Sequence, residues 1–437
     1  LGDVYKRQMP TSIELLATVL FGLAIIHTFT VPIFAKIAHR PGPHQGLWHL
    51  LSEVEGVFGL WATIFLVIMA ATGGIESAVH YMDGRNFTEP LFVFAIMVIA
   101  ASRPILDLVQ RIVRYLARVL PVQTEVAQFF ITLSLVPLAG SIITEPAAMT
   151  LAALMLKEGY FSRAQSVKYK YLALGVLFVN ISIGGVLTAF AAPPVLIVAN
   201  TFGWDSLFML TTFGWKAVIA VFINAIAITF ICRREIIRTA RIPITKETRI
   251  ERGGVAERAE VVPASVILVH CLFLLGVVFF SHHPHIFMGM LMLFIGYCTA
   301  YNRYQNPLLI KEGLMVGFFL AGLLILGGMQ QWWLQSLLAG LEPLVLFVGS
   351  TALTAITDNA ALTYLGSLVE GTSPEWRYML VAGAVSGGGL TVIANAPNPA
   401  GFSLLRRSFP DQAIAAQYLL LAALGPTLVA SLLFVLL

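Results

Sequence analysis

A seven-residue pattern that carries a carboxylate occurs twice in this chain of 437 residues. The first copy reads TEPAAMT over residues 144–150, and the second reads TDNAALT over residues 357–363. Each copy places one acid, Glu145 or Asp358, directly after a threonine and inside an otherwise apolar stretch. A carboxylate at mid-membrane costs about 2.5–3.5 kcal/mol on insertion scales, so it is rarely present there without a partner or an ion. The duplicated acids therefore predict a site that handles ions.

Hard cations such as Na+ prefer carboxylate, hydroxyl and carbonyl oxygens as ligands. In the first copy Pro146 removes a backbone donor and breaks the helix. Irregular backbone at membrane depth is tolerated only within protein or around a cavity. The two acids are predicted to bind Na+ or a proton, together with the polar residues beside them. The predicted ion- and proton-binding residues are Glu145, Asp358, Thr144, Thr357 and Asn359. The alternative is structural, with the acids paired with each other or with Lys216.

A second element is also repeated. GGVLT at residues 184–188 is answered by GGGLT at residues 387–391, and each is followed by a segment that contains proline. The acidic patterns lie 213 residues apart (Thr144 to Thr357) and the glycine patterns 203 (Gly184 to Gly387), which fits an extra basic loop at 157–170. Glycine, threonine and proline together indicate discontinuous helices, whose freed backbone groups bind ions. The predicted residues of this broken-helix site are Thr188, Thr391, Asn395, Asn398, Gly184, Gly185, Gly388 and Gly389.

The composition indicates a polytopic membrane protein of the all-α class, because 58% of the residues are hydrophobic and only 11% are charged. Spanning a bilayer takes about 20 apolar residues. Ten spans are predicted on this basis: 12–35, 54–79, 88–102, 171–192, 206–232, 262–281, 284–300, 312–330, 378–395 and 412–437. Between the third and fourth span of each half lies an interrupted apolar stretch, 122–157 or 343–370, which is predicted to form a re-entrant helical hairpin.

Because five is an odd number of spans, the second half enters the membrane from the side opposite to the first. The two halves are therefore predicted to be inverted-topology repeats. The repeats are 9–232 and 261–437, joined by a cytoplasmic linker at 233–260, and residues 1–8 are interpreted as a scar of cloning or assembly. Most of the 27 lysines and arginines then fall on the cytoplasmic side, as the positive-inside rule requires. This orientation places both termini outside the cell and the protein in the inner (plasma) membrane.

Other sequence features exclude several functions. There is no GxxxxGK[ST] phosphate loop and no plausible set of nucleophile, base and orienting group, so neither an enzyme nor a cofactor is expected. The expected partners are membrane lipid, a monovalent cation and the proton, with a homodimer possible and nucleic acid excluded. Four arginines lie along a predicted surface helix, where anionic lipid headgroups are the simplest contact: Arg103, Arg111, Arg114 and Arg118.

The repeated segments resemble the ion-transporter superfamily of sodium/proton antiporters, arsenite pumps and dicarboxylate transporters, most closely its antiporter and arsenite-pump branches. The matching segments are SIITEPAAMT and AITDNAALT, followed by NISIGGVLTAFAAPP and SGGGLTVIANAPN. The resemblance implies two inverted repeats, a site built from a hairpin and a broken helix of each, and elevator-like movement of that part against a scaffold. The chain departs from the family pattern where Glu145-Pro146 replaces an Asp-Asn pair.

The expected function is secondary active transport, with a sodium(cation)/proton antiporter favoured because both acids can bind either ion. A sodium- or proton-coupled anion carrier, such as a dicarboxylate or arsenite permease, is the alternative within transport. Two carboxylates without an evident intramembrane arginine argue against an anionic substrate. A membrane-embedded enzyme that uses the acids as general acid and base would need further catalytic groups.

Overall fold

The computed structural model describes residues 10–38, 44–52, 54–161, 166–240, 261–409 and 414–437. Residues 1–8 and most of the predicted linker lie outside these ranges. Within them every regular element is helical, in agreement with the predicted all-α class. Two compact units are distinguished: unit 1 comprises residues 1–94, 310–342 and 364–374, and unit 2 comprises residues 95–309, 343–363 and 375–437.

Five helical segments in the described residues are long and apolar enough to cross a membrane, or up to seven if each of two bent helix pairs counts as one span. The five are Gly56–Gly73, Val167–Leu187, Ser206–Arg238, Ile310–Gly327 and Ala416–Leu436. The protein is therefore a multi-pass membrane protein. Several other predicted spans correspond to shorter apolar helices, among them Ala264–Phe279 and Pro284–Ala300.

Unit 1 is built around two helices, α3 (Val54–Gly73) and α17 (Ile310–Gly327), that pack closely on each other. Gly322 makes this possible, because a Cβ there would lie 2.5 Å from the Phe58 carbonyl oxygen. The sequence predicted one span over 54–79, but Gly74, with φ 87°, separates α3 from the next helix. The remaining helices of unit 1 are α1 (Ser12–Ala38), α2 (Gln45–Leu51), α4 (Ile75–Asp83), α18 (Gln331–Leu338), the first part of α5 (Thr88–Ala100) and the end of α20 (Asn359–Ser367).

Each of the two predicted hairpins contains a break in unit 2, where one helix ends and the next begins. In the first half these helices are α7 (Thr124–Leu133), α8 (Leu135–Ile143) and α9 (Glu145–Leu156). In the second half they are α19 (Pro343–Thr354) and the start of α20. The acids stand at the breaks, where α9 and α20 begin.

Two further interrupted helices follow the hairpins in the chain. α10 (Val167–Gly184) continues as a 3-10 turn to Leu187, and α11 (Pro193–Phe202) begins after an irregular segment. α21 (Pro374–Gly387) is likewise separated from α22 (Asn398–Leu405) by irregular residues. Each interruption begins at the predicted glycine run, since glycine has low helix propensity and proline has no N–H to donate.

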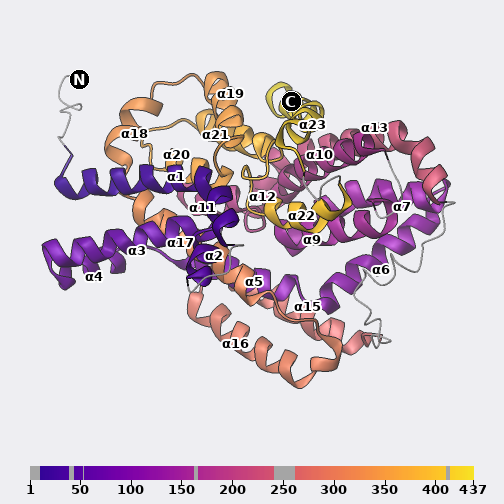
Figure 1. The fold of residues 1–437 in the computed structure, drawn as a ribbon, viewed down its shortest axis with the longest axis horizontal. Helices are drawn as coiled ribbons and strands as arrows, with labels where there is room; N and C mark the ends of the chain where they lie inside the picture. The colour runs from indigo at the N-terminus through magenta and orange to yellow at the C-terminus, as the bar shows by residue number, and fades with distance from the viewer. Residues whose placement is uncertain (1–9, 39–43, 53, 162–165, 241–260, 410–413) are drawn as a thin grey trace. The chain divides into compact units, whose positions relative to one another are not determined.

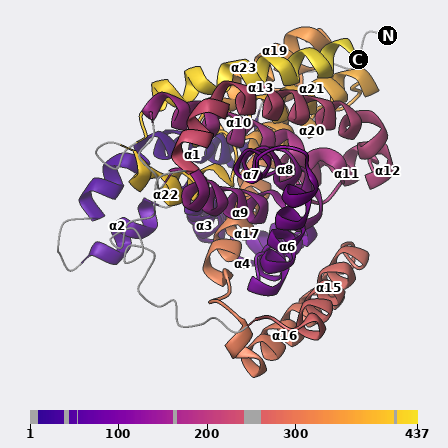
Figure 2. The ribbon, with the colours of Figure 1, turned by 90° about the vertical axis from the view of Figure 1, so that its right-hand side faces the viewer.

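The rest of unit 2 surrounds these segments. α10 packs against α13 (Trp215–Ala240) and α23 (Ala416–Leu436), and the Asn224 side chain donates a 2.9 Å hydrogen bond to Asn180 Oδ1 between α13 and α10. α12 (Ser206–Met209) precedes α13. α6 (Arg103–Val119), α15 (Ala264–Phe279) and α16 (Pro284–Ala300) lie together at one edge of the unit (Figures 1 and 2).

Candidate ion-binding site

The break between α8 and α9 depends on an unusual backbone conformation at Thr144. This residue has φ 72° and ψ 152°, and it is the one non-glycine residue with a positive φ among those that the structure describes. That region of φ/ψ space is essentially restricted to glycine, so a β-branched residue is strained there. The conformation ends α8 and starts α9 at Glu145, with Pro146 in the first turn. The strained residue thus directly precedes the acid.

Glu145 is completely buried, with 0% of its surface exposed. Its Oε2 accepts a 2.8 Å hydrogen bond from Asn395 Nδ2, which comes from the irregular segment before α22. Its Oε1 is buried without a hydrogen-bond partner. Gly185 lies against this carboxyl group, and a Cβ at Gly185 would overlap Oε1. One carboxylate oxygen is therefore held in place, while the other remains available to a ligand.

Asp358 occupies the equivalent place in the second hairpin, but it has a different local role. It is half-buried, and its Oδ1 accepts hydrogen bonds from the backbone N–H groups of Ala360 at 2.8 Å and Ala361 at 3.1 Å. Asp358 therefore caps the N-terminus of α20, a position where a carboxylate is favoured. The surroundings of the two acids are linked, because Asn395 donates to Glu145 and the neighbouring Ala394 carbonyl accepts from the N–H of Asn359, the residue after Asp358. The structure thus brings the two predicted acids into one region of unit 2.

The threonines beside the acids differ in their contacts. Thr144 Oγ1 is buried without a hydrogen-bond partner, next to Glu145. Thr357 is half-buried, and its hydroxyl donates a 2.9 Å hydrogen bond to the Leu353 carbonyl. The Thr144 hydroxyl is consequently available to bind a ligand, whereas the hydroxyl proton of Thr357 is already donated to the Leu353 carbonyl.

Three asparagines present unpaired oxygens in the same unit. Asn359, Asn395 and Asn398 are buried, and the Oδ1 atom of each has no hydrogen-bond partner. The backbone N–H of Asn359 donates to the Ala394 carbonyl at 3.1 Å, which joins the hairpin break to the irregular segment between α21 and α22. Asn398 Nδ2 donates to the carbonyls of Gly388 and Thr391, each at 2.8 Å. Unpaired buried oxygens are uncommon and call for a functional or unseen partner.

The threonines of the two glycine patterns make matching contacts in the two halves. Thr188 Oγ1 donates to the Ser141 carbonyl at 2.7 Å, and Thr391 Oγ1 donates to the Ala355 carbonyl at 2.8 Å. In both cases the acceptor lies just before or within the break of the hairpin in the same half. These hydroxyls bind the broken helix to the hairpin, which is a positioning role.

The glycines of these patterns allow backbone to approach backbone. A Cβ at Gly184 would lie 2.7 Å from the Pro137 carbonyl oxygen, and one at Gly387 would lie 2.5 Å from that of Thr351. At Gly388 a Cβ would lie 2.8 Å from Asn359 Nδ2, and at Gly389 it would overlap the backbone of Val179. Side chains at these positions would therefore push the broken helices away from the site.

Sequence reasoning missed two hydroxyl residues that precede the breaks. Ser141 Oγ donates to the Gly184 carbonyl at 2.7 Å and accepts a 2.9 Å hydrogen bond from the Leu187 N–H. Thr354 lies 213 residues later, at the equivalent position, and its buried hydroxyl has no partner. Extending the repeat to the fourth residue before each acid would have identified this pair.

Lys216 does not form the structural ion pair that was the alternative to an ion site. Its Nζ donates a 2.9 Å hydrogen bond to the Tyr378 hydroxyl and lies 4.6 Å from the centre of that ring. The Tyr378 hydroxyl donates in turn to the Phe434 carbonyl at 2.7 Å. Glu145 is held by Asn395 and not by this lysine. Among the described residues, no group of three or more His, Cys, Asp or Glu is placed to hold a metal ion.

Comparison with known proteins assigns the chain to a family. No curated protein matches it. The sequence profile of a family described as "Putative Na+/H+ antiporter" matches residues 12–437, nearly the whole chain. Members of such a family are transporters and not enzymes, as the missing catalytic residues predicted. This chain belongs to the putative Na+/H+ antiporter family.

Proposed function

We propose that the protein is a secondary active antiporter of the inner membrane that exchanges Na+ for H+. The observation that carries the proposal is the environment of Glu145, a fully buried carboxyl group with one oxygen fixed by Asn395 and the other unpaired. A buried carboxylate is costly unless it is paired, protonated or bound to a cation. Glu145 therefore has a physical reason to hold either a proton or Na+ at all times.

Competition for this carboxyl group couples the two fluxes. Na+ binds the ionised carboxylate, whereas protonation removes the charge that attracts the cation. Asp358 belongs to the same region, because Asn395 donates to Glu145 and the adjacent Ala394 carbonyl accepts from the N–H of Asn359, beside Asp358. With two acids in one place, loading of either one influences ion binding at the other.

Neutral oxygens complete the proposed coordination of Na+. Thr144 Oγ1 and the side-chain carbonyls of Asn359 and Asn395 are buried and unpaired in the same unit. They have the oxygen chemistry that hard cations prefer. Asp358 contributes charge, while part of its carboxylate remains bound to the N-terminus of α20.

Alternating access is proposed to be elevator-like, with unit 2 carrying the site. Both acids, both hairpin breaks and both interrupted helices belong to unit 2. α3 and α17 belong to unit 1, which contributes none of the proposed ligands. This division supports movement of the site with one compact body.

The proposal is tested with the purified protein in liposomes that contain a pH-sensitive dye. An imposed pH gradient should dissipate on addition of Na+, and a Glu145→Gln, Asp358→Asn double variant should abolish this response. Glu375→Gln with Asp205→Asn is the matched control, since both of these acids are exposed and Asp205 also caps a helix. The control should exchange normally.

Normal Na+/H+ exchange by the Glu145→Gln, Asp358→Asn variant would contradict the proposal. Uptake of labelled succinate or arsenite without any pH response would instead favour an anion carrier. Comparing Na+, Li+, K+ and Ca2+ at several pH values identifies the transported cation.

A further inference from the structure

α6 carries two neighbouring stripes of different chemistry on its outer surface. Its buried side chains are Pro104, Ile105, Val113 and Ala117. The exposed side presents an apolar stripe in which Ile112 is 49% exposed, Tyr115 is 67% exposed and Val119 is 64% exposed. Directly beside it runs a basic stripe, spaced by three and four residues, of Arg111, Arg114 and Arg118.

The charge of this helix is strongly positive. Asp107 is the one acid in a sequence that contains four arginines. It lies 2.7 Å from Arg111 Nη2 and 4.0 Å from Arg114 Nη2, so it offsets part of the charge at the start of the basic stripe. Arg118 lies one further turn along and is exposed. The C-terminal half of α6 therefore combines net positive charge with exposed apolar surface.

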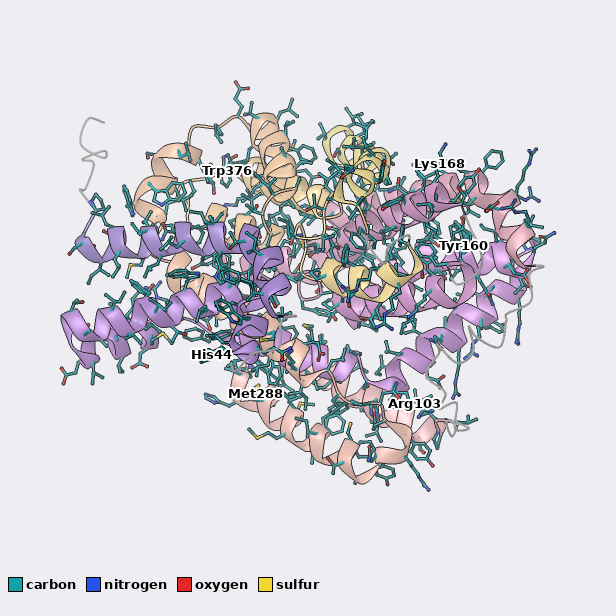
Figure 3. All side chains as sticks on the ribbon, viewed as in Figure 1. His44, Arg103, Tyr160, Lys168, Met288 and Trp376 are labelled. Atoms are coloured by element: carbon teal, nitrogen blue, oxygen red, sulfur yellow. The ribbon has the colours of Figure 1, made fainter. Side chains whose placement is uncertain are left out.

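A sharp bend sets the direction of α6 apart from that of the helix before it. α6 is bent by 63° from α5, the apolar helix before it. Arg103 lies at the start of α6 (Figure 3). On its other side α6 is fixed to the protein, because Arg111 Nη2 donates to the Val262 carbonyl at 3.0 Å and Leu108 packs on a cluster that includes Val266. The two exposed stripes are thus held in a fixed orientation.

We propose that α6 is an interfacial helix that binds the anionic phospholipid surface of the membrane. Exposed apolar side chains of such a helix enter the boundary between headgroups and acyl chains, and the flanking arginines reach the lipid phosphates. Tyr115 suits this boundary, because its ring is apolar and its hydroxyl is polar. A zwitterionic surface would accommodate the apolar stripe, but it has no net negative charge to attract the arginines.

This contact acts on the proposed ion site through the chain. α6 leads through residues 120–123 into α7, the first helix of the hairpin that carries Glu145, and it packs against both α7 and α8. Anionic lipid bound to α6 therefore stabilises the first arm of that hairpin. Binding of lipid to α6 does not depend on which ion is transported.

The test measures binding of phosphatidylglycerol to the purified full-length protein in phosphatidylcholine mixed micelles, followed as a rise in melting temperature. Wild-type protein should show a saturable rise that high salt abolishes. An Arg114→Gln, Arg118→Gln double variant should melt at the wild-type temperature without phosphatidylglycerol, but need on the order of tenfold more of it for half of the rise. Arg114→Lys with Arg118→Lys should restore wild-type binding.

Two controls separate this site from general attraction of anions. Arg406→Gln with Arg407→Gln removes two exposed charges elsewhere in unit 2 and should leave the titration unchanged. Inorganic phosphate at the same concentrations should produce no rise. A wild-type titration curve in the Arg114→Gln, Arg118→Gln variant would overturn the proposal. Equal weakening by the Arg406→Gln, Arg407→Gln pair, or a rise with inorganic phosphate alone, would overturn it too.

Discussion

The backbone of Thr144 holds a conformation that a glycine would adopt with less strain. At φ 72° and ψ 152°, the Cβ atom of alanine or threonine is sterically strained, whereas glycine has no Cβ. Thr144→Gly should therefore be more stable than Thr144→Ala by about 1 kcal/mol or more, as judged from thermal unfolding in detergent. Both variants lose the hydroxyl, so their difference isolates the backbone.

Thr150 provides the matched control within the same helix, α9. Its hydroxyl donates to the Pro146 carbonyl at 2.9 Å, which is ordinary helical geometry. The order should be reversed here, with Thr150→Gly less stable than Thr150→Ala by about 1 kcal/mol. If Thr144→Gly were less stable than Thr144→Ala, as expected at Thr150, Thr144 would not be strained.

Asn395 is the residue that fixes the Glu145 carboxylate. Replacing it by alanine removes a hydrogen bond to a charged group, which is worth about 1.5–3 kcal/mol. Under the proposed function, Asn395→Ala should raise the KM for Na+ about tenfold or more in the liposome assay. Asn302→Ala, at an exposed position in another part of unit 2, should leave KM unchanged. A wild-type KM in Asn395→Ala would remove this residue from the site.

At the scale of elements, a glycine just after α10 allows the chain there to pack closely against Glu145 at the start of α9. A Cβ at Gly185 would overlap Glu145 Oε1, so Gly185→Ala should displace the carboxyl group and lower the exchange rate strongly, while the protein still folds. Gly296→Ala in α16, where the added Cβ would have no atom within 4 Å, should behave as wild type. Exchange rate and melting temperature are measured together for both variants. Full exchange by Gly185→Ala would contradict the close contact.

The positions of the breaks were predictable from sequence, because glycine, proline and the acids mark them locally. The interrupted stretches predicted at 122–157 and 343–370 contain α7, α8 and α9 and then α19 and α20, while the re-entrant path of each stretch stays a prediction. The capping role of Asp358 was also within reach, since aspartate before a helical run is a common N-cap. The interruption at Gly74 was missed because one glycine in an apolar run fits a continuous span equally well.

The partner of Glu145 could not be predicted in the same way. Asn395 was identified only as polar and repeated, and the contact between them joins residues far apart in the chain. No local pattern encodes which amide meets which carboxylate. Likewise, the φ of Thr144 follows from how the surrounding helices fix the chain, and threonine itself gives no signal of it.

For the whole molecule, the distribution of charge predicts an orientation that can be measured. With most lysines and arginines on the cytoplasmic side, the C-terminus after α23 is predicted to lie outside the cell. Alkaline phosphatase fused after Leu437 should then be active in bacterial cells, and green fluorescent protein at the same place should be dark. A fluorescent fusion would contradict the predicted number of spans or their orientation.

The hydrogen bond between Glu145 and Asn395 joins residues 250 positions apart, which has a consequence for synthesis. At about 5–20 residues per second, Glu145 leaves the ribosome on the order of 10–50 s before Asn395 exists. Throughout that interval the nascent first half holds its acid without its native amide donor. The completed site therefore arises late, and biogenesis of the first half must shelter a carboxyl group whose partner is still being translated.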